Sequence, residues 1–185
     1  MTRPHVVDGW RIDVTVRPGV PRVLAGTEVA QVVAAALAAA GAPRPASLSV
    51  VLTDDAELAN LNLAHLGSVG PTDVLSFPLL PPEAFPSHEG QETHGADGAA
   101  DEFVLPPRTR PHLGDIAISV ERAIAQATEG RGGQTGDVRW DTASEMRLLL
   151  THGTLHVCGW DHAEPTEEAA MRALERRLLG VVPGR

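Results

Sequence analysis

Three histidines lie close together near the carboxyl end of the chain, in the stretch HGTLHVCGWDH that spans residues 152–162. His152 and His156 are four residues apart, so a helix would place them on one face with their Cβ atoms about 5–6 Å apart. Gly159 is typical of a helix end, because glycine readily adopts the left-handed conformation that closes the last turn. The returning chain can then bring His162 to the same point. The motif therefore predicts a helix that ends at Gly159, with three imidazoles gathered around one position.

Three neutral imidazoles are a ligand set that suits zinc. Each nitrogen binds zinc at about 2.0–2.1 Å, and three of them leave the fourth tetrahedral position to water, whose pKa falls to about 7. We therefore predict one Zn²⁺ per chain, bound by His152, His156 and His162, in a site suited to hydrolysis. Nickel, copper or iron could occupy the same ligands. A single histidine on a helix is more often a surface or core residue, and the group of three at this spacing is what favours a metal.

The rest of the chain alternates between strand and helix patterns. Thr27 is the expected N-cap of the first helix, and Asp54 with Glu57 resembles a capping box at the second. The fold class is therefore α/β (α+β), with a small mixed four-stranded sheet flanked by about five helices. The expected strands are 11–16, 47–53, the VLSF within 71–78, and 113–120, and the expected helices are 27–41, 54–67, 121–130, 141–159 and 166–180.

The composition indicates one domain over residues 1–185. The hydrophobic content of 43% is enough for a single sizeable core, and no apolar stretch reaches the roughly 20 residues that a membrane span needs. Residues 80–111 are rich in proline, glycine and polar side chains, so we expect a flexible insertion there. Cys158 cannot pair within the chain and is expected to be a packing residue. We expect a cytoplasmic protein without membrane contact.

The net charge of −9 argues against a generic nucleic-acid binder and against DNA as a partner, because non-specific affinity comes from neutralising phosphates with basic side chains. A nucleic-acid role would need a local basic patch. Arg172 and Arg176 are one helical turn apart and could form such a patch with Arg147 and Arg177. Glu168 lies four residues before Arg172, which favours an ordinary salt-bridged face.

The spacing of the histidines also matches the zinc-protease pattern HExxHxxGxxH, in which the glutamate beside the first histidine is the general base. In this chain that position is Gly153, so a peptidase would lack its base. The absent side chain could leave room for substrate beside the metal. Asp161, next to the third histidine, could accept a hydrogen bond from a histidine ring or merely cap the turn.

HGTLHVCGWDH resembles the HGxLHLxGYDH signature of the YbeY family, bacterial rRNA maturation factors and single-strand-specific metallo-endoribonucleases. Two further segments agree with this family in the same order, PTDVLSFP at 71–78 and LGDIAIS at 113–119. LNLAHLG at 61–67 corresponds to the helix before the proline turn. The resemblance covers about residues 10–180.

The resemblance implies a zinc ion at the three histidine positions, and action on precursors of 16S rRNA with a role in ribosome quality control. Many members carry a Tyr-Arg pair in the helix before the proline turn, and its arginine is associated with RNA binding or cleavage. This chain has His65 and Leu66 there, so a cationic substrate contact is expected to be missing. Whether cleavage survives that change stays open, as does the role of the insertion at 80–111, which is longer than usual and not basic.

Asp73 and Ser76 fall on the strand that should line the metal cleft. They are candidates to contact substrate or metal-bound water, and hence candidate catalytic residues. The alternative, which we favour slightly, is that Asp73 caps the proline turn and Ser76 fills a strand position. Asp115 in LGDIAIS has the same ambiguity.

Three functions from different classes follow. The leading hypothesis is a zinc-dependent, single-strand-specific endoribonuclease that acts on rRNA precursors. A second is a metal-dependent hydrolase of another substrate, with a peptidase as its extreme form. A third is a zinc-containing ribosome assembly factor without nuclease activity, which binds ribosomal proteins or a ribosome-associated GTPase.

Overall fold

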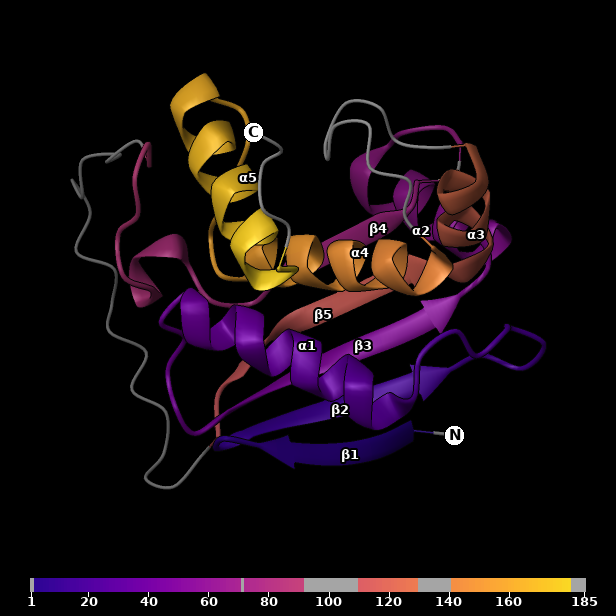
Figure 1. Ribbon diagram of the computed structural model, residues 1–185, viewed down its shortest axis with the longest axis horizontal. Helices are drawn as coiled ribbons and strands as arrows, with labels where there is room; N and C mark the ends of the chain where they lie inside the picture. Colours follow the sequence, from indigo (N-terminus) through magenta and orange to yellow (C-terminus); the bar gives the residue numbers. More distant parts are fainter. Residues whose placement is uncertain (1, 71, 92–109, 130–140, 181–185) are drawn as a thin grey trace.

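A five-stranded sheet with helices on both faces forms the core of the protein, as a computed structural model shows for residues 2–70, 72–91, 110–129 and 141–180 (Figure 1). The strand order is β1-β2-β3-β5-β4. The elements in chain order are β1 (Thr2–Val7), β2 (Trp10–Val16), α1 (Gly26–Ala39), β3 (Ala46–Thr53), α2 (Asp55–Leu66), β4 (Val74–Pro78), the 3₁₀ helix η1 (Pro82–Ala84), β5 (His112–Ser119), α3 (Val120–Glu129), α4 (Thr142–Val157) and α5 (Pro165–Leu178). The predicted α/β class with a mixed sheet and five α-helices is confirmed.

The sheet has one strand more than the four that the sequence predicts. Strands β2, β3 and β5 are parallel, while β1 and β4 run antiparallel at the two edges. The missed strand β1 is exposed along most of its length and contains Pro4, which is tolerated because an edge strand has one unpaired side. Asp8 and Gly9 both have positive φ and join β1 to β2 in a two-residue hairpin. This Asp-Gly pair was the sequence signal for the extra strand.

The two faces of the sheet bury different sets of side chains. Helices α1 and α4 cover one face and form the main core with Trp10, Ile12 and Ile116, whereas α2 covers the other face beside β4. Because side chains alternate along a strand, Leu75 and Phe77 of β4 point toward α2 while Val74 and Ser76 point toward α4. Edge strand β4 therefore offers Val74, Ser76 and Pro78 to the helix that carries two of the histidines.

One predicted helix start and one predicted capping box need correction. Helix α1 begins at Gly26 with Ala25 as its N-cap, so Thr27 already lies inside the first turn and does not cap it. The N-cap of α2 is Asp54, whose carboxylate accepts a hydrogen bond from the Glu57 backbone N–H at 2.8 Å, as predicted. The carboxylate of Glu57 does not complete a capping box, because it binds Arg17 and Thr53.

The first part of the predicted insertion packs onto the domain. Residues 80–91 contain η1, bury the ring of Phe85 and place Gly90 against the backbone of Glu167 at the start of α5. Residues 92–109, and the loop predicted at 131–137, lie outside the described residues, so the flexibility of the insertion stays a prediction. Among the described residues, no helix is long and apolar enough to cross a membrane.

Candidate metal centre

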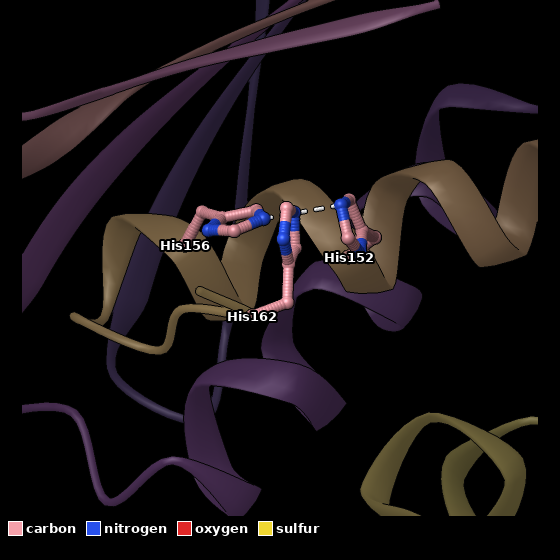
Figure 2. Close-up of side chains that lie close together, drawn as sticks. All are labelled: His152, His156 and His162. Carbon is pink, nitrogen blue, oxygen red and sulfur yellow. Dashed lines mark hydrogen bonds between the residues drawn. The ribbon is translucent and has the colours of Figure 1, made fainter. Parts of the chain in front are cut away.

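The three histidines meet at the end of α4 (Figure 2). His152 and His156 project from the same face of the helix, with their Nε2 atoms 3.1 Å apart. The ring of His162 lies 5.7 Å from that of His152 and 5.0 Å from that of His156, measured between centroids. One ligand nitrogen from each histidine lies within 4.8 Å of the other two, so the group could hold a metal ion. The predicted juxtaposition of the three side chains is confirmed.

The spacing of the His152 and His156 nitrogens fits a tetrahedral ion. Two nitrogens bound to one zinc at about 2.0–2.1 Å are roughly 3.3 Å apart, close to the spacing of the His152 and His156 Nε2 atoms. The three ligand atoms come from imidazoles alone, and this donor chemistry suits zinc better than calcium or magnesium, which prefer oxygen.

His156 is partly buried, as is His152, whereas His162 is exposed. Burial, together with charge repulsion from the nearby His152 and His162, lowers the pKa of His156 to about 4. The imidazole of His156 is therefore neutral at physiological pH and keeps its lone pair for a metal.

A buried carboxylate fixes the ring of His152. Glu175, on α5, is 6% exposed, and its Oε1 lies 2.8 Å from His152 Nδ1. An ionised carboxylate can only accept, so Nδ1 carries the proton and Nε2 presents its lone pair to the other two histidines. Glu175 thus sets both the tautomer and the orientation of this ring.

The turn after α4 closes as the sequence predicts. Gly159 has a φ of +83°, and the Trp160 N–H donates to the Leu155 carbonyl at 3.1 Å, which closes the helix in a Schellman motif. The Asp161 carboxylate accepts from the His162 backbone N–H at 2.7 Å, so its role in the turn is that of a cap. Cys158 is buried, which raises the pKa of its thiol to about 12, and it is a packing residue as expected.

Gly153 lets α4 approach the sheet closely. A Cβ atom at this position would lie 3.0 Å from methyl carbons of Ile116 and Val74 and 3.2 Å from the Ser76 Oγ. The expectation that the missing side chain leaves room for substrate is therefore wrong, because sheet residues occupy that space. A glutamate in the protease position would require these neighbouring side chains to shift.

A cavity of about 610 Å³ opens beside the histidines and brings the sequence-predicted residues together. Asp73 and Ser76 both line it, opposite His152 and His156. The Ser76 hydroxyl donates to the Gly153 carbonyl at 3.0 Å and so ties β4 to α4. None of the described residues that line this cavity is an arginine.

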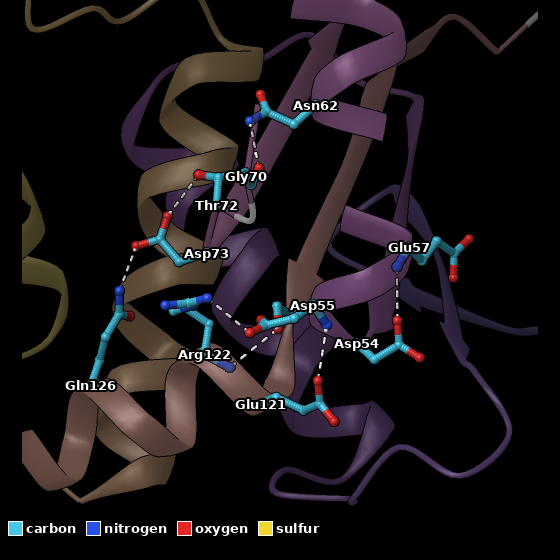
Figure 3. A network of polar contacts seen from close by, with 11 residues as sticks. Asp54, Asp55, Glu57, Asn62, Gly70, Thr72, Asp73, Glu121, Arg122 and Gln126 are labelled. Atoms are coloured by element: carbon cyan, nitrogen blue, oxygen red, sulfur yellow. Dashed lines mark hydrogen bonds and ion pairs between the residues drawn. The ribbon is translucent and has the colours of Figure 1, made fainter. Parts of the chain in front are cut away.

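Asp73 anchors one end of the cavity through a polar network (Figure 3). Its carboxylate accepts from the Val74 backbone N–H at 2.9 Å and from the Gln126 amide at 3.1 Å. Nearby, Asp55 accepts from Arg122 of α3 at 2.9 Å, which joins the start of α2 to α3. These contacts hold the proline turn in place, in line with the capping role favoured for Asp73.

Other residues singled out in the sequence lie away from the histidines or are paired. Asp115 binds His112 at 3.0 Å and does not line the cavity. Arg147 pairs with Glu28 of α1, and Arg172 pairs with Glu168 at 2.6 Å, as a salt-bridged helix face would. Arg172 also borders a small cavity of about 130 Å³ that His152 and His162 share. The side chain of Leu66 is outside the described part of the chain.

Sequence reasoning missed four residues that support the site: His88, Trp160, Glu167 and Glu175. Glu167, Met171 and Glu175 recur every four residues and are all buried, so the buried face of α5 carries two carboxylates. A charged residue on the apolar face of a helix is rarely fully buried without a partner. That pattern was the available signal for Glu167 and Glu175, whereas nothing in the sequence pointed to His88.

Fold and site together define a class of protein: an α/β domain with an open three-histidine group, of the kind that binds a catalytic metal, at the end of a late helix. Residues 20–182 match the family described as Endoribonuclease YbeY. The chain belongs to the YbeY family, which confirms the resemblance seen in its motifs.

Two relatives that are more than a third identical to this chain over the aligned residues agree with this assignment. Endoribonuclease YbeY of Roseiflexus castenholzii is 37% identical over 172 residues, which cover 92% of this chain and 92% of that protein. Endoribonuclease YbeY of Salinispora tropica is 41% identical over 140 residues, which cover 75% of this chain and 76% of that protein. A solution structure of a Thermotoga maritima protein is 17% identical, with a TM-score of 0.46 over 90% of this chain and 89% of its own.

Proposed function

We propose that this protein is a zinc-dependent endoribonuclease that cleaves single-stranded RNA in the maturation of 16S rRNA and in ribosome quality control. The observation that carries the proposal is the meeting of three histidines beside an open cavity, in a chain whose relatives are named endoribonucleases. His152, His156 and His162 would hold the ion. As a bound ion, zinc supplies Lewis acidity toward a phosphate oxygen and lowers the pKa of a coordinated water.

The protein's own side chains prepare this chemistry in two ways. Glu175 keeps the His152 ring in one tautomer, with Nε2 facing the other histidines. Burial keeps His156 neutral, so proton binding does not compete with metal binding at that ring near neutral pH. Asp73 and Ser76 stay candidates to contact the substrate from the β4 side of the cavity.

The dimensions of the cavity favour a single strand as substrate. A volume of about 610 Å³ is that of a small-molecule pocket, which admits a nucleotide or two but not a double helix. Because no described lining residue is an arginine and the net charge is −9, phosphate contacts in the cavity contribute little affinity beyond the metal. Contacts with ribosomal proteins or a ribosome-associated GTPase would then deliver the RNA, in the cytoplasm.

The direct test is cleavage of a single-stranded 16S rRNA precursor fragment by zinc-loaded protein, with the same fragment annealed to its complement as the control. We expect cleavage of the single strand, loss of cleavage with a chelator, and at least about a 100-fold lower rate for His156→Ala, which lacks a metal ligand. Intact single-stranded RNA after incubation with fully metal-loaded protein would refute the nuclease proposal.

The assembly-factor alternative draws support from the acidic net charge and from the absence of an arginine among the described cavity residues. Complementation of a deletion strain separates the two functions. Rescue of 16S rRNA maturation by His156→Ala, expressed at the wild-type level, would favour an assembly factor, and failure to rescue would favour the enzyme. A peptidase is disfavoured because the sheet fills the place of its glutamate.

A further inference from the structure

The third histidine lies on a part of the chain that has little local support. His162 and its neighbours from Asp161 to Glu164 are exposed, between the end of α4 and the start of α5. The Schellman motif of α4 reaches only to Trp160. Beyond that point the backbone N–H of Asp161 donates to Glu167 Oε1 at 2.9 Å. A side chain of α5 thus holds the residue immediately before His162.

The same carboxylate oxygen is held from a distant segment. His88 Nε2 lies 2.7 Å from Glu167 Oε1, and the two side chains are only 7% and 8% exposed. A carboxylate buried to this extent needs hydrogen-bond partners, because desolvation of a charge is costly. His88 and the Asp161 N–H are those partners, so Glu167 is fixed from one side and fixes the turn on the other.

His88 also contacts the turn directly. Its ring is stacked on Trp160, with the centroids 3.9 Å apart and the planes 11° from parallel. Trp160 lies two residues before His162. The segment of His88 is itself ordered by a local turn, in which the Gln91 N–H donates to the His88 carbonyl at 3.3 Å. Residues 88–91 therefore pack against both ends of the turn that carries the third histidine.

We propose that His88 and Glu167 are positioning residues for the third metal ligand, and that they couple the start of the 80–111 insertion to the metal centre. Without them, His162 would have to be ordered when the ion binds, and the lost conformational freedom would weaken binding. Linkage is reciprocal, so a bound ion also stabilises the packing of residues 88–91. The inference rests on the metal site of the proposed function, although not on its substrate.

The first test is a zinc competition titration of the full-length apoprotein against a chromophoric chelator. His88→Phe keeps an aromatic ring for stacking on Trp160 but loses the hydrogen bond to Glu167, and we expect its zinc Kd to rise about tenfold, the low end of the range for residues that orient a ligand. The matched control is His112→Phe, which removes another histidine–carboxylate pair, with Asp115, away from the cavity. Its Kd should equal that of the wild type.

Two substitutions of Glu167 distinguish a positioning role from a direct effect of its charge on the ion. The carbonyl oxygen of Glu167→Gln can still accept from the Asp161 N–H, so this variant should bind zinc nearly as tightly as the wild type, whereas Glu167→Ala should bind about tenfold more weakly. Equal weakening by both variants would mean that the charge of Glu167 acts on the ion and would overturn a positioning role.

Amide hydrogen exchange of the wild-type protein tests the coupling without relying on a variant that must fold. We expect zinc to slow amide hydrogen exchange in residues 88–91 and 160–163 by about fivefold or more, with β1 unchanged. Unchanged exchange in 88–91 in a protein that binds zinc would overturn the coupling, and so would equal Kd values for His88→Phe, His112→Phe and the wild type. A wild type that binds no zinc would instead refute the metal site of the proposed function.

Discussion

The two halves of the histidine cluster are built in different ways. His152 and His156 project from one helix, so their spacing follows from the helical repeat alone. His162 projects from an exposed turn, whose position depends on Glu167 of α5 and His88 of a segment more than 70 residues earlier. The difference teaches that one metal centre can combine ligands fixed by local geometry with a ligand fixed by tertiary contacts, and that the two should fail in different ways.

The helix half is tied to the fold itself. Gly153 lies between the two histidines and packs against Ile116 and Val74, while Ser76 binds its carbonyl. A change that moves α4 therefore disturbs the core as well as the ligands. The turn from Asp161 to Glu164 is exposed, so changes to His162 should alter metal binding more than stability.

The largest expected effect is that of Gly153→Glu. The new side chain would collide with Ile116 and Val74 and bury a charge, so we expect the free energy of unfolding to fall by about 3 kcal/mol or more. Urea denaturation measures this change. Gly153→Ala is the matched control, in which a gain of about 1 kcal/mol in helix propensity offsets part of an overpacking cost of about 1–3 kcal/mol. A Gly153→Glu protein as stable as the wild type would show that α4 is not pinned to the sheet.

The second largest effect is expected when one of the histidine ligands is removed. His156→Ala removes a ligand that the helix already holds in place, and we expect zinc affinity to fall by about 3 kcal/mol, or roughly 100-fold or more. His162→Ala leaves the His152 and His156 pair intact and should lose less, because α4 still holds two ligand nitrogens at the spacing that one ion needs. Competition titration at one pH gives both values. A greater loss for His162→Ala than for His156→Ala would reverse the comparison.

The helix half of the site and much of the fold can be predicted from the sequence because both depend on local signals. The His152 and His156 spacing, the Asp54 cap and the terminal glycine at 159 are local signals, and each is present in the structure. The strand at Thr2–Val7 went unpredicted because it is exposed and contains a proline, despite the Asp-Gly turn behind it.

The contacts that complete the site join residues far apart in the chain, and they leave weaker signals in the sequence. Glu175 is 23 residues from His152 and Glu167 is 79 residues from His88, and no spacing rule joins such pairs. The missing side chain of Gly153 was interpreted as room for substrate, because the sheet residues that fill this space, Ile116 and Val74, are remote in the chain. The buried carboxylates of α5 could have been noticed from their helical face, but the atoms that they bind could not.

A smaller effect should follow from Glu175→Gln, which tests whether α5 supports zinc binding by the helix half. The amide carbonyl can still accept from His152 Nδ1, but a neutral amide is a weaker acceptor than a carboxylate and holds the ring less firmly, so we expect zinc to bind about tenfold more weakly. Glu168→Gln is the matched control: it removes the same charge from the same helix and borders the same small cavity, but its partner is Arg172. Equal weakening by the two variants would assign the effect to net charge and not to the His152 contact.

The smallest effect is expected for Ser76→Ala, which tests the link between β4 and α4 from the strand side. The variant loses the hydrogen bond to the Gly153 carbonyl, so the free energy of unfolding should fall by about 1 kcal/mol while the zinc Kd stays within about twofold of the wild type. Urea denaturation and competition titration provide the two values, and an RNA cleavage assay adds a third. Because Ser76 also lines the cavity, a rate that falls tenfold or more with metal affinity intact would mean that its hydroxyl contacts the substrate as well as the helix. An unchanged rate would leave Ser76 as part of the frame that holds His152 and His156, and Asp73 would then be the remaining candidate on the β4 side.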